Sequence, residues 1–345
     1  MIEVTRYHDD KLIGRWLLIC AVTIFGMILL GGVTRLTESG LSMVDWQPIM
    51  GVIPPLSTAD WVYLFEQYKL FPEYQLINTG MSLDEFKQIF WFEYLHRVLG
   101  RFIGLLFFFP LMAFLWMGKV HPRLKPHLFA LLILGGCQGL MGWYMVQSGL
   151  VDRPDVSQYR LTAHLGLAIA IYGYIVWLTI GLFSPERTIR LGHASAALSL
   201  VPLVYLMILT GGFVAGTNAG LSFPTWPLMG DSFIPPALYR DGFVSVFEQV
   251  TTIHFNHRML AYATGLIVVT AALHSVLRSH DLRVRIASVL MMAAVTLQIV
   301  LGIGTVLSNV NVTIAAGHQS GAVVLLTTVL YWVHCKRTER MPSVS

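Results

Sequence analysis

Residues 92–100, FEYLHRVLG, and residues 253–261, IHFNHRMLA, carry one motif that occurs twice in this chain of 345 residues. Each copy leads into a long apolar run, where an ionisable side chain is costly and is a candidate for function. The copies lie 161 positions apart, and Glu93 of the first is replaced by His254 in the second. Glu93 precedes His96 by three residues, about one helical turn on the same face. The motifs therefore predict two related sites that differ in one acidic group.

The rest of the chain has the composition of an integral membrane protein. It is 55% hydrophobic and only 12% charged, with a mean hydropathy of +0.64, which is more apolar length than a soluble core would bury. Helices are expected, because a membrane span must satisfy its own backbone and the runs lack the alternation of a barrel. Eight apolar runs are long enough to span a bilayer: 13–33, 95–117, 127–147, 161–182, 193–214, 256–277, 286–307 and 314–334. The first run is too long for a signal peptide and lacks a cleavage pattern, so we expect it to remain a span.

The Lys and Arg residues predict the orientation of these spans. Fourteen of the 23 lie at the termini and in alternate loops, and six lie in the other loops. Cytoplasmic segments carry such an excess, so we expect both termini to be cytoplasmic in a cell inner membrane. The net charge of +4 requires no nucleic acid, because the excess lies where the inner leaflet of the lipid bilayer attracts it. Cys20, Cys137 and Cys335 lie in or beside spans and offer no disulfide framework in an outer loop.

A second repeat predicts two tandem halves. Residues 31–46 and 211–226 share Gly-Gly, Thr, Gly-Leu-Ser and Trp at a constant offset of 180. Glycine caps on two helices would explain the glycines but not the shared tail. We therefore interpret the chain as two pseudo-symmetric four-helix bundles, 1–185 and 186–345, in a parallel repeat. We expect each glycine-rich segment to turn back over a cofactor pocket, and an ordinary interfacial Trp is the alternative.

The first outer loop, residues 34–92, is long and rich in aromatic residues, and loops of this length are usually functional. Ser82 to Glu85 have the pattern of a capping box, so the helix with Glu93 should begin about two turns or more before the membrane. We interpret the loop as a lid over the first site. A solvated or surface-lying hairpin is the alternative.

Four histidines complete the candidate sites. In this topology His96, His164, His257 and His318 lie in the first turns below the outer surface, one pair in each half. Two imidazoles that face each other across a four-helix core suit axial ligation of haem iron. A di-metal centre normally adds carboxylates, and the second half has none near its pair. Any one of these histidines could be a satisfied core residue, but four at equivalent places favour two haem sites.

The charged neighbours give the two sites different expected roles. Arg97 and Arg258 follow the first histidine of each pair, and haem propionates or outer headgroups are their expected partners. Glu93, one turn from His96, can transfer a proton or stabilise positive charge beside a haem edge. Orienting Arg97 or a loop is the alternative role for Glu93. We therefore expect a fixed cofactor at the second site and chemistry at the first.

Together these motifs resemble the heme A synthase family across essentially the whole chain. The resemblance is carried by Glu-x-x-His-Arg at 93–97, His-Arg at 257–258, the single histidines at 164 and 318, and the glycine-rich repeats. The segment at 35–42 is similar to the proteobacterial and mitochondrial branch. In another branch the first outer loop holds a cysteine pair, which is absent here, so a redox relay through such a pair is in doubt.

The resemblance implies that the C8 methyl group of haem O is oxidised by successive hydroxylations to a formyl group, giving haem A for terminal oxidases. It implies haem B as a cofactor on His257 and His318, substrate haem between His96 and His164, and Glu93 as the catalytic residue. Implied partners are a haem O synthase (protoheme farnesyltransferase), oxidase assembly factors, and a quinone or other electron acceptor.

Two other functions fit the same residues. A di-haem b-type membrane cytochrome that passes electrons from quinol would hold both haems permanently and would not need Glu93. A haem exporter or chaperone would use the outer loop to gate release, without oxidation. The haems bound and produced would separate the three functions.

Overall fold

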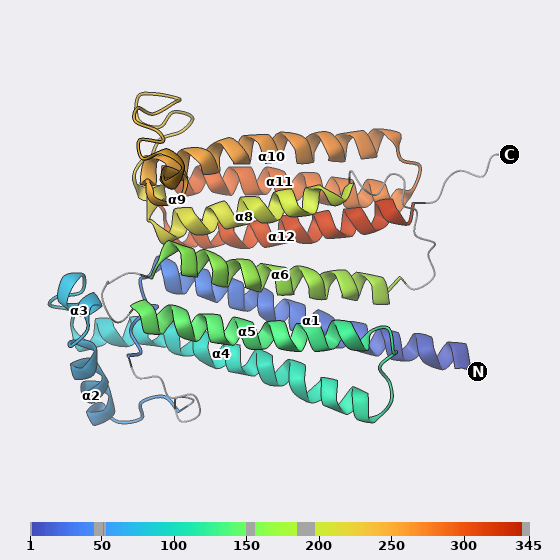
Figure 1. The fold of residues 1–345 in the computed structure, drawn as a ribbon, viewed down its shortest axis with the longest axis horizontal. Coiled ribbons are helices and arrows are strands. Elements are labelled where there is room, and N and C mark those ends of the chain that lie inside the picture. The colour runs from blue at the N-terminus through green and yellow to red at the C-terminus, as the bar shows by residue number, and fades with distance from the viewer. Residues whose placement is uncertain (1, 45–50, 52, 150–155, 185–196, 340–345) are drawn as a thin grey trace.

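The computed structural model describes residues 2–44, 51, 53–149, 156–184 and 197–339. Within these residues the structure is helical and contains no sheet, so the predicted all-α class is confirmed. The helices are α1 (Ile2–Leu36), α2 (Thr58–Tyr68), α3 (Pro72–Leu76), α4 (Leu83–Trp116), α5 (Lys125–Gly149), α6 (Gln158–Leu182), α8 (Leu200–Gly216), η2 (Ala219–Leu221), η3 (Gly242–Val244), α9 (Ser245–Glu248), α10 (Val250–Arg278), α11 (Leu282–Leu307) and α12 (Val312–Arg337). Figure 1 shows the long helices side by side, with α2, α3 and α9 at one end. We call this end the loop end.

Among the described residues, seven helices are long and apolar enough to cross a membrane: α1, α4, α5, α6, α10, α11 and α12. They correspond to seven of the eight predicted runs. The run predicted at 193–214 corresponds to α8, which has 17 residues. At ~1.5 Å per residue α8 is about 26 Å long, somewhat less than the ~30 Å of hydrocarbon. Residues 185–196 lie outside the described part of the chain, so the eighth span stays a prediction.

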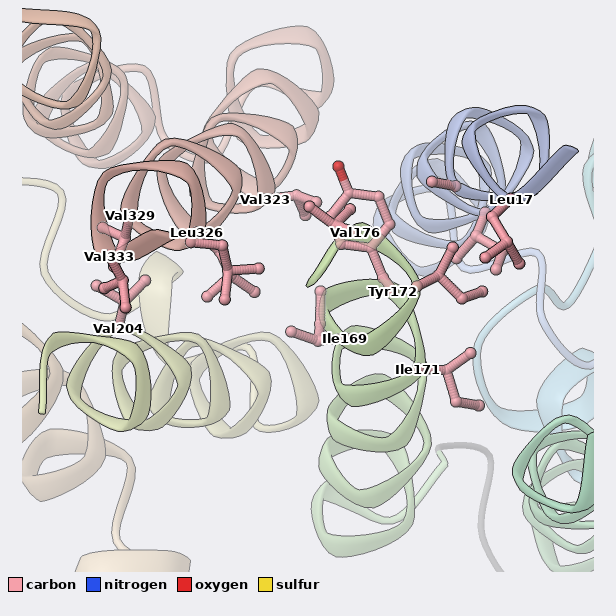
Figure 2. Packing of buried hydrophobic residues seen from close by; sticks show 14 of the residues in the cluster. Leu17, Ile169, Ile171, Tyr172, Val176, Val204, Val323, Leu326, Val329 and Val333 are labelled. Atoms are coloured by element: carbon pink, nitrogen blue, oxygen red, sulfur yellow. The ribbon is translucent and has the colours of Figure 1, made fainter. Parts of the chain in front are cut away.

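The long helices form two groups that meet in the middle of the molecule (Figure 1). In the first group α1 contacts α4 and α6, and α5 contacts α6. In the second group α10 contacts α8 and α11, and α11 contacts α12. The groups meet where α6 packs on α8 and α1 packs on α12. Figure 2 shows buried apolar side chains in this region, including Leu17, Tyr172, Val204 and Leu326, which come from all four of these helices.

The start of α4 agrees with the sequence prediction. The Ser82 hydroxyl accepts a hydrogen bond from the backbone N–H of Glu85, and the Glu85 carboxylate accepts one from the backbone N–H of Ser82. This reciprocal pair confirms the predicted capping box. The helix then continues past Pro110 to Trp116. Its first turns lie at the loop end (Figure 1).

Those first turns of α4 support a small aromatic lobe, the name used here for α2, α3 and the side chains of α4 that pack against them. Tyr68 is completely buried and lies against Phe86. Its hydroxyl donates to Oε2 of Glu73 at 3.0 Å and accepts from Nδ2 of Asn78 at 2.8 Å. Burial, together with the nearby Glu73 carboxylate, raises the pKa of Tyr68 above its ordinary value of 10.0. The lobe is therefore a packed structure, and its role as a lid stays a prediction.

The glycine-rich segment after the first span differs from the expectation. Helix α1 continues to Leu36, so Gly31 and Gly32 lie inside the helix and not in a turn. The turn comes later, where Glu38 has a left-handed φ of 51°. Asn218, 180 positions further on, has a φ of 53° just after α8. The two helices thus end in turns of matching conformation.

Candidate functional site

The four predicted ligand histidines lie in two pairs. His96 on α4 lies near His164 on α6. His257 on α10 lies near His318 on α12. The four helices all begin at the loop end, and each histidine lies within the first half of its helix. The structure therefore brings together the residues that were predicted to pair.

A glycine on a neighbouring helix faces each of these rings. The pairs are Gly31 with His96, Gly142 with His164, Gly211 with His257, and Gly302 with His318. A Cβ atom at Gly302 would lie 2.8 Å from Cε1 of His318, and one at Gly31 would lie 3.1 Å from Nε2 of His96. Both distances are tighter than ordinary contacts, so the glycines leave room for the rings.

Sequence reasoning missed this role. Gly142 recurs 160 positions later as Gly302, and from the sequence such small residues indicate only close helix packing, while Gly31 and Gly211 were expected to lie in a turn. The available signal was the recurrence itself, because Gly31 recurs after 180 positions and Gly142 after 160, just as the two histidines recur after 161 and 154. Glycines that recur with candidate ligands are candidates for contact with them.

Both rings of the second pair are held through Nδ1. Nδ1 of His318 lies 3.2 Å from the main-chain oxygen of Gln298, and because a carbonyl only accepts, Nδ1 carries the proton. Nδ1 of His257 lies 2.8 Å from the hydroxyl of Thr210, which donates its own proton to the main-chain oxygen of Met207. His257 therefore also donates from Nδ1. Each Nε2 keeps its lone pair, which is the arrangement of a histidine that binds a metal.

The first pair is held differently. The ring of His96 makes no hydrogen bond within the part of the chain that the structure describes. Nε2 of Gln138 lies 3.2 and 3.3 Å from the two ring nitrogens of His164 and 3.1 Å from its main-chain oxygen. Because a neutral imidazole has only one acceptor nitrogen, this amide group can donate to the main-chain oxygen and to one of the two ring nitrogens. The rings of this pair are less firmly oriented than those of the second pair.

Glu93 is buried, with 3% of its surface exposed, and three donors occupy its carboxylate. Oε2 accepts from the hydroxyl of Ser42 at 2.8 Å and from the backbone N–H of Met43 at 2.7 Å. Oε1 accepts from Arg97, which also donates to the main-chain oxygen of Met43 at 2.8 Å. Glu93 therefore orients both Arg97 and the turn after α1, as the alternative interpretation proposed. Ser42 was not foreseen, and a chemical role for Glu93 stays a prediction.

The second half repeats this arrangement without the acid. Arg258 donates at 2.9 Å to the main-chain oxygen of Phe223, which lies 180 positions after Met43. It also donates to the main-chain oxygen of Leu228 at 3.2 Å and, through Nε, to Nε2 of His254 at 3.1 Å. His254 thus occupies the place of Glu93. Both arginines bind their own turns, and propionates as partners stay a prediction.

The residues present fit a haem in each half. A porphyrin would supply four ligands to its iron, and the two imidazoles of each pair would supply the remaining two. In the second half the hydrogen bonds at Nδ1 of His257 and His318 fix the tautomer that such ligation requires. Among the described residues, no group of three or more His, Cys, Asp or Glu side chains could hold a metal ion without such a macrocycle.

Comparisons with known proteins identify a family to which this sequence is similar. The family model described as cytochrome oxidase assembly protein, COX15-CtaA, matches residues 14–330. A heme A synthase of Nitrosospira multiformis is 47% identical over 336 residues, covering 95% of this chain and 94% of the relative. One from Paramagnetospirillum magneticum is also 47% identical, over 338 residues, with the same coverage. One from Nitrosomonas eutropha is 45% identical over 345 residues, covering 96% of this chain and 95% of the relative.

Proposed function

The chain belongs to the COX15-CtaA family of heme A synthases, and we propose that its two histidine pairs divide the reaction between a cofactor site and a substrate site. It is a membrane oxidoreductase that acts on a methyl group of haem O and converts haem O to haem A. The C8 methyl group is hydroxylated in successive steps and becomes a formyl group. Haem O therefore binds to the protein as the substrate, and haem A leaves it as the product.

We assign the second pair, His257 and His318, to a permanent haem B. The support is the hydrogen bond at each Nδ1, from His257 to Thr210 and from His318 to the main chain of Gln298. Such contacts fix the ring orientation and raise the basicity of a ligand. When bound, haem B supplies one-electron transfer. The protein contributes two preoriented imidazoles and, at Gly211 and Gly302, the room that they need.

We assign the first pair, His96 and His164, to haem O. The observation that supports this assignment is the unequal anchoring of the two pairs, because among the described residues none gives His96 the hydrogen bond that holds each ring of the second pair. A haem substrate that must bind and then leave requires histidine ligands that can release its iron. Helices α4 and α5 also contact each other much less than their counterparts α10 and α11 do. The first half is therefore the more open one, as exchange of a haem requires.

We propose Glu93 as the catalytic carboxylate of the first site. It lies one turn from His96, and its place in the second half is taken by His254. Ser42, Met43 and Arg97 hold the carboxylate in one orientation. A carboxylate fixed beside the substrate can accept a proton during hydroxylation or stabilise positive charge that develops on the reacting carbon. Glu93→Gln should therefore lower haem A formation by roughly 10²-fold or more.

We further propose that the molecule has eight spans in two tandem halves, 1–185 and 186–345, with the loop end outside the cytoplasm. The distribution of Lys and Arg supports this orientation. The repeat is supported by matching contacts, because Arg97 binds the carbonyl of Met43 and Arg258 that of the equivalent Phe223. Both haem sites would then lie near the periplasmic face, with the aromatic lobe covering the first.

Mass analysis of extracted haems tests this division of roles. Purified wild-type protein, expressed with a supply of haem O, should carry haem B and yield haem A. The variants His257→Ala and His318→Ala should lose haem B. The variants His96→Ala, His164→Ala and Glu93→Gln should keep haem B and yield no haem A. His127→Ala, outside both pairs, is the control, and haem A from Glu93→Gln at the wild-type level would contradict the proposal.

A further inference from the structure

Two arginines at the loop end of the first half have no counterpart in the second. Arg35 lies in the last turn of α1, and Arg160 lies in the first turn of α6. The equivalent positions, 180 and 154 residues later, are Ala215 and Ile314. At these two positions the first half therefore carries arginines where the second half carries apolar side chains.

Both arginines lie one turn from the first histidine pair. Arg35 follows Gly31, which faces His96, by four residues, and Arg160 precedes His164 by four residues. Helices α1 and α6 pack against each other and run in opposite directions. One turn of about 5.4 Å on each helix therefore leads from the site to the same end of the bundle. Both arginines are half-buried, and each lies on its helix one turn nearer the loop end than the site residue of that helix.

Neither guanidinium has a carboxylate partner in the described part of the chain. Arg35 donates to the amide oxygen of Asn218 at 2.9 Å, which is a neutral acceptor. Arg160 lies over the ring of Tyr144, 4.8 Å from its centroid. An aromatic face holds a guanidinium plane while its N–H edge stays open to an anion. By contrast, Arg97 is paired with Glu93.

We propose that Arg35 and Arg160 bind the propionate carboxylates of the haem substrate in the first site, an inference that rests on the proposed function. Arginine binds a carboxylate through two parallel hydrogen bonds, which fix orientation as well as position. In haem O the C8 methyl group is on the same pyrrole ring as one propionate. Arginines that hold the propionates therefore also determine where the reacting methyl group lies.

The absence of these arginines from the second half agrees with this role. A haem that stays bound would be retained by two fixed imidazoles, which His257 and His318 would provide. A haem that exchanges through less firmly held ligands needs a second means of orientation. Ala215 and Ile314 would give no such means, whereas Arg35 and Arg160 would.

A binding titration of haem O against its propionate dimethyl ester tests the inference. Protein loaded with haem B would be titrated as wild type, Arg35→Gln, Arg160→Gln and the double variant, with absorbance as the signal. Wild type should bind haem O more tightly than the ester. Each single substitution should lower the ratio of the two affinities roughly tenfold. The double variant should bind both compounds equally, with an unchanged content of haem B. Arg278→Gln, in the last turn of α10 at the other end of the bundle, is the matched control.

The possible outcomes separate this inference from the proposed function. A double variant that still prefers haem O to the ester as strongly as wild type overturns the role of the arginines and leaves the substrate site standing. Wild type that binds neither compound overturns the substrate site itself. Loss of haem B from the double variant would place the arginines at the second site or in folding, and would also overturn the inference.

Discussion

Thr210 and the main chain of Gln298 give His257 and His318 a fixed tautomer, and no described residue holds the ring of His96 in a comparable way. The same residue types can therefore serve a permanent ligand set in one half and an exchangeable set in the other. What changes is the hydrogen bond behind each ring, together with the replacement of His254 by Glu93. The residues that hydrogen-bond the ligand histidines therefore determine the different roles of the two sites. Each of them can be tested by a single substitution.

Gly302→Ala should reduce the content of haem B without unfolding the protein. Its Cβ would lie 2.8 Å from Cε1 of His318, so the ring must move away from the position in which Gln298 holds it. Haem B per protein, measured by pigment extraction, should fall at least several-fold. Gly211→Ala should have a smaller effect, because its Cβ would meet His257 at 3.4 Å, an ordinary contact. Gly104→Ala meets no atom within 4 Å and is the control. Equal haem B in all three would contradict this role of glycine.

Ser42→Ala should lower haem A formation while haem B stays bound. The substitution removes one of three donors to the buried Glu93 carboxylate, and hydrogen bonds to charged groups contribute about 1.5–3 kcal/mol. Loss of that amount from the reactive arrangement corresponds to roughly 10- to 100-fold in rate. Ser42→Thr keeps the hydroxyl and should restore part of the activity. Ser222→Ala, the equivalent exposed position in the second half, is the control. An unchanged rate in Ser42→Ala would show that the other two donors are sufficient.

Among the elements, α4 connects the aromatic lobe to the first site. The helix begins at the Ser82–Glu85 capping box, carries the lobe on Phe86 and Phe90, and one turn later presents Glu93. Because these residues follow one another on a single helix, a change in how the lobe packs alters the first turns of α4, on which Glu93 depends. The lobe is also where a titratable hydroxyl is buried, at Tyr68.

The stability of the aromatic lobe should fall as pH rises above about 10. Burial and Glu73 raise the pKa of Tyr68, so the folded lobe keeps this proton at a pH where the unfolded segment loses it. Below pH 10 both states are protonated and the effect is absent. Protease cleavage between α2 and α4, measured from pH 9 to 11, should therefore accelerate in wild type.

The variant Tyr68→Phe should be cleaved faster than wild type at neutral pH, since it loses a buried hydrogen bond worth about 1–3 kcal/mol. It should lack the additional increase in cleavage rate above pH 10. Tyr63→Phe, at an exposed position, should behave as wild type.

In the whole molecule, glycines let the two groups of helices approach beside the first histidine pair. On α8, Gly212 and Gly216 have the spacing of a small-residue packing motif and lie against Thr162 and Gln158 of α6. On the other side of the interface, Gly32 of α1 lies against Gln319 of α12, whose amide donates to the main-chain oxygen of Ile28 at 2.7 Å. Gln319 adjoins His318, and Thr162 is two residues from His164. The interface is therefore continuous with both sites.

How well a feature of the fold or the site could be predicted depends on how far apart in the sequence its residues lie. The helices, the capping box and the candidate histidines are read from hydropathy and spacing within one segment. The hydrogen bond between Ser42 and Glu93 joins residues that are 51 positions apart, so it depends on how the turn after α1 folds back on α4. The contact of Gly31 with His96 likewise depends on which helices become neighbours. The run predicted at 193–214 begins among residues that the structure does not describe, so its full length stays a prediction.

Gly216→Ala should separate α6 from α8 and thereby lower both stability and haem A formation. Its Cβ would lie 2.7 Å from Cα of Gln158, and backbone cannot move aside as a side chain can. Overpacking of this kind costs about 1–3 kcal/mol, so the apparent unfolding midpoint in detergent should fall by several degrees. Gly32→Ala should be milder, because it meets the side chain of Gln319, and Gly181→Ala, with no atom within 4 Å, should be neutral. Because His164 lies on α6, haem A should fall further than haem B in Gly216→Ala. A variant as stable as Gly181→Ala would show that the two groups are not held together at this contact.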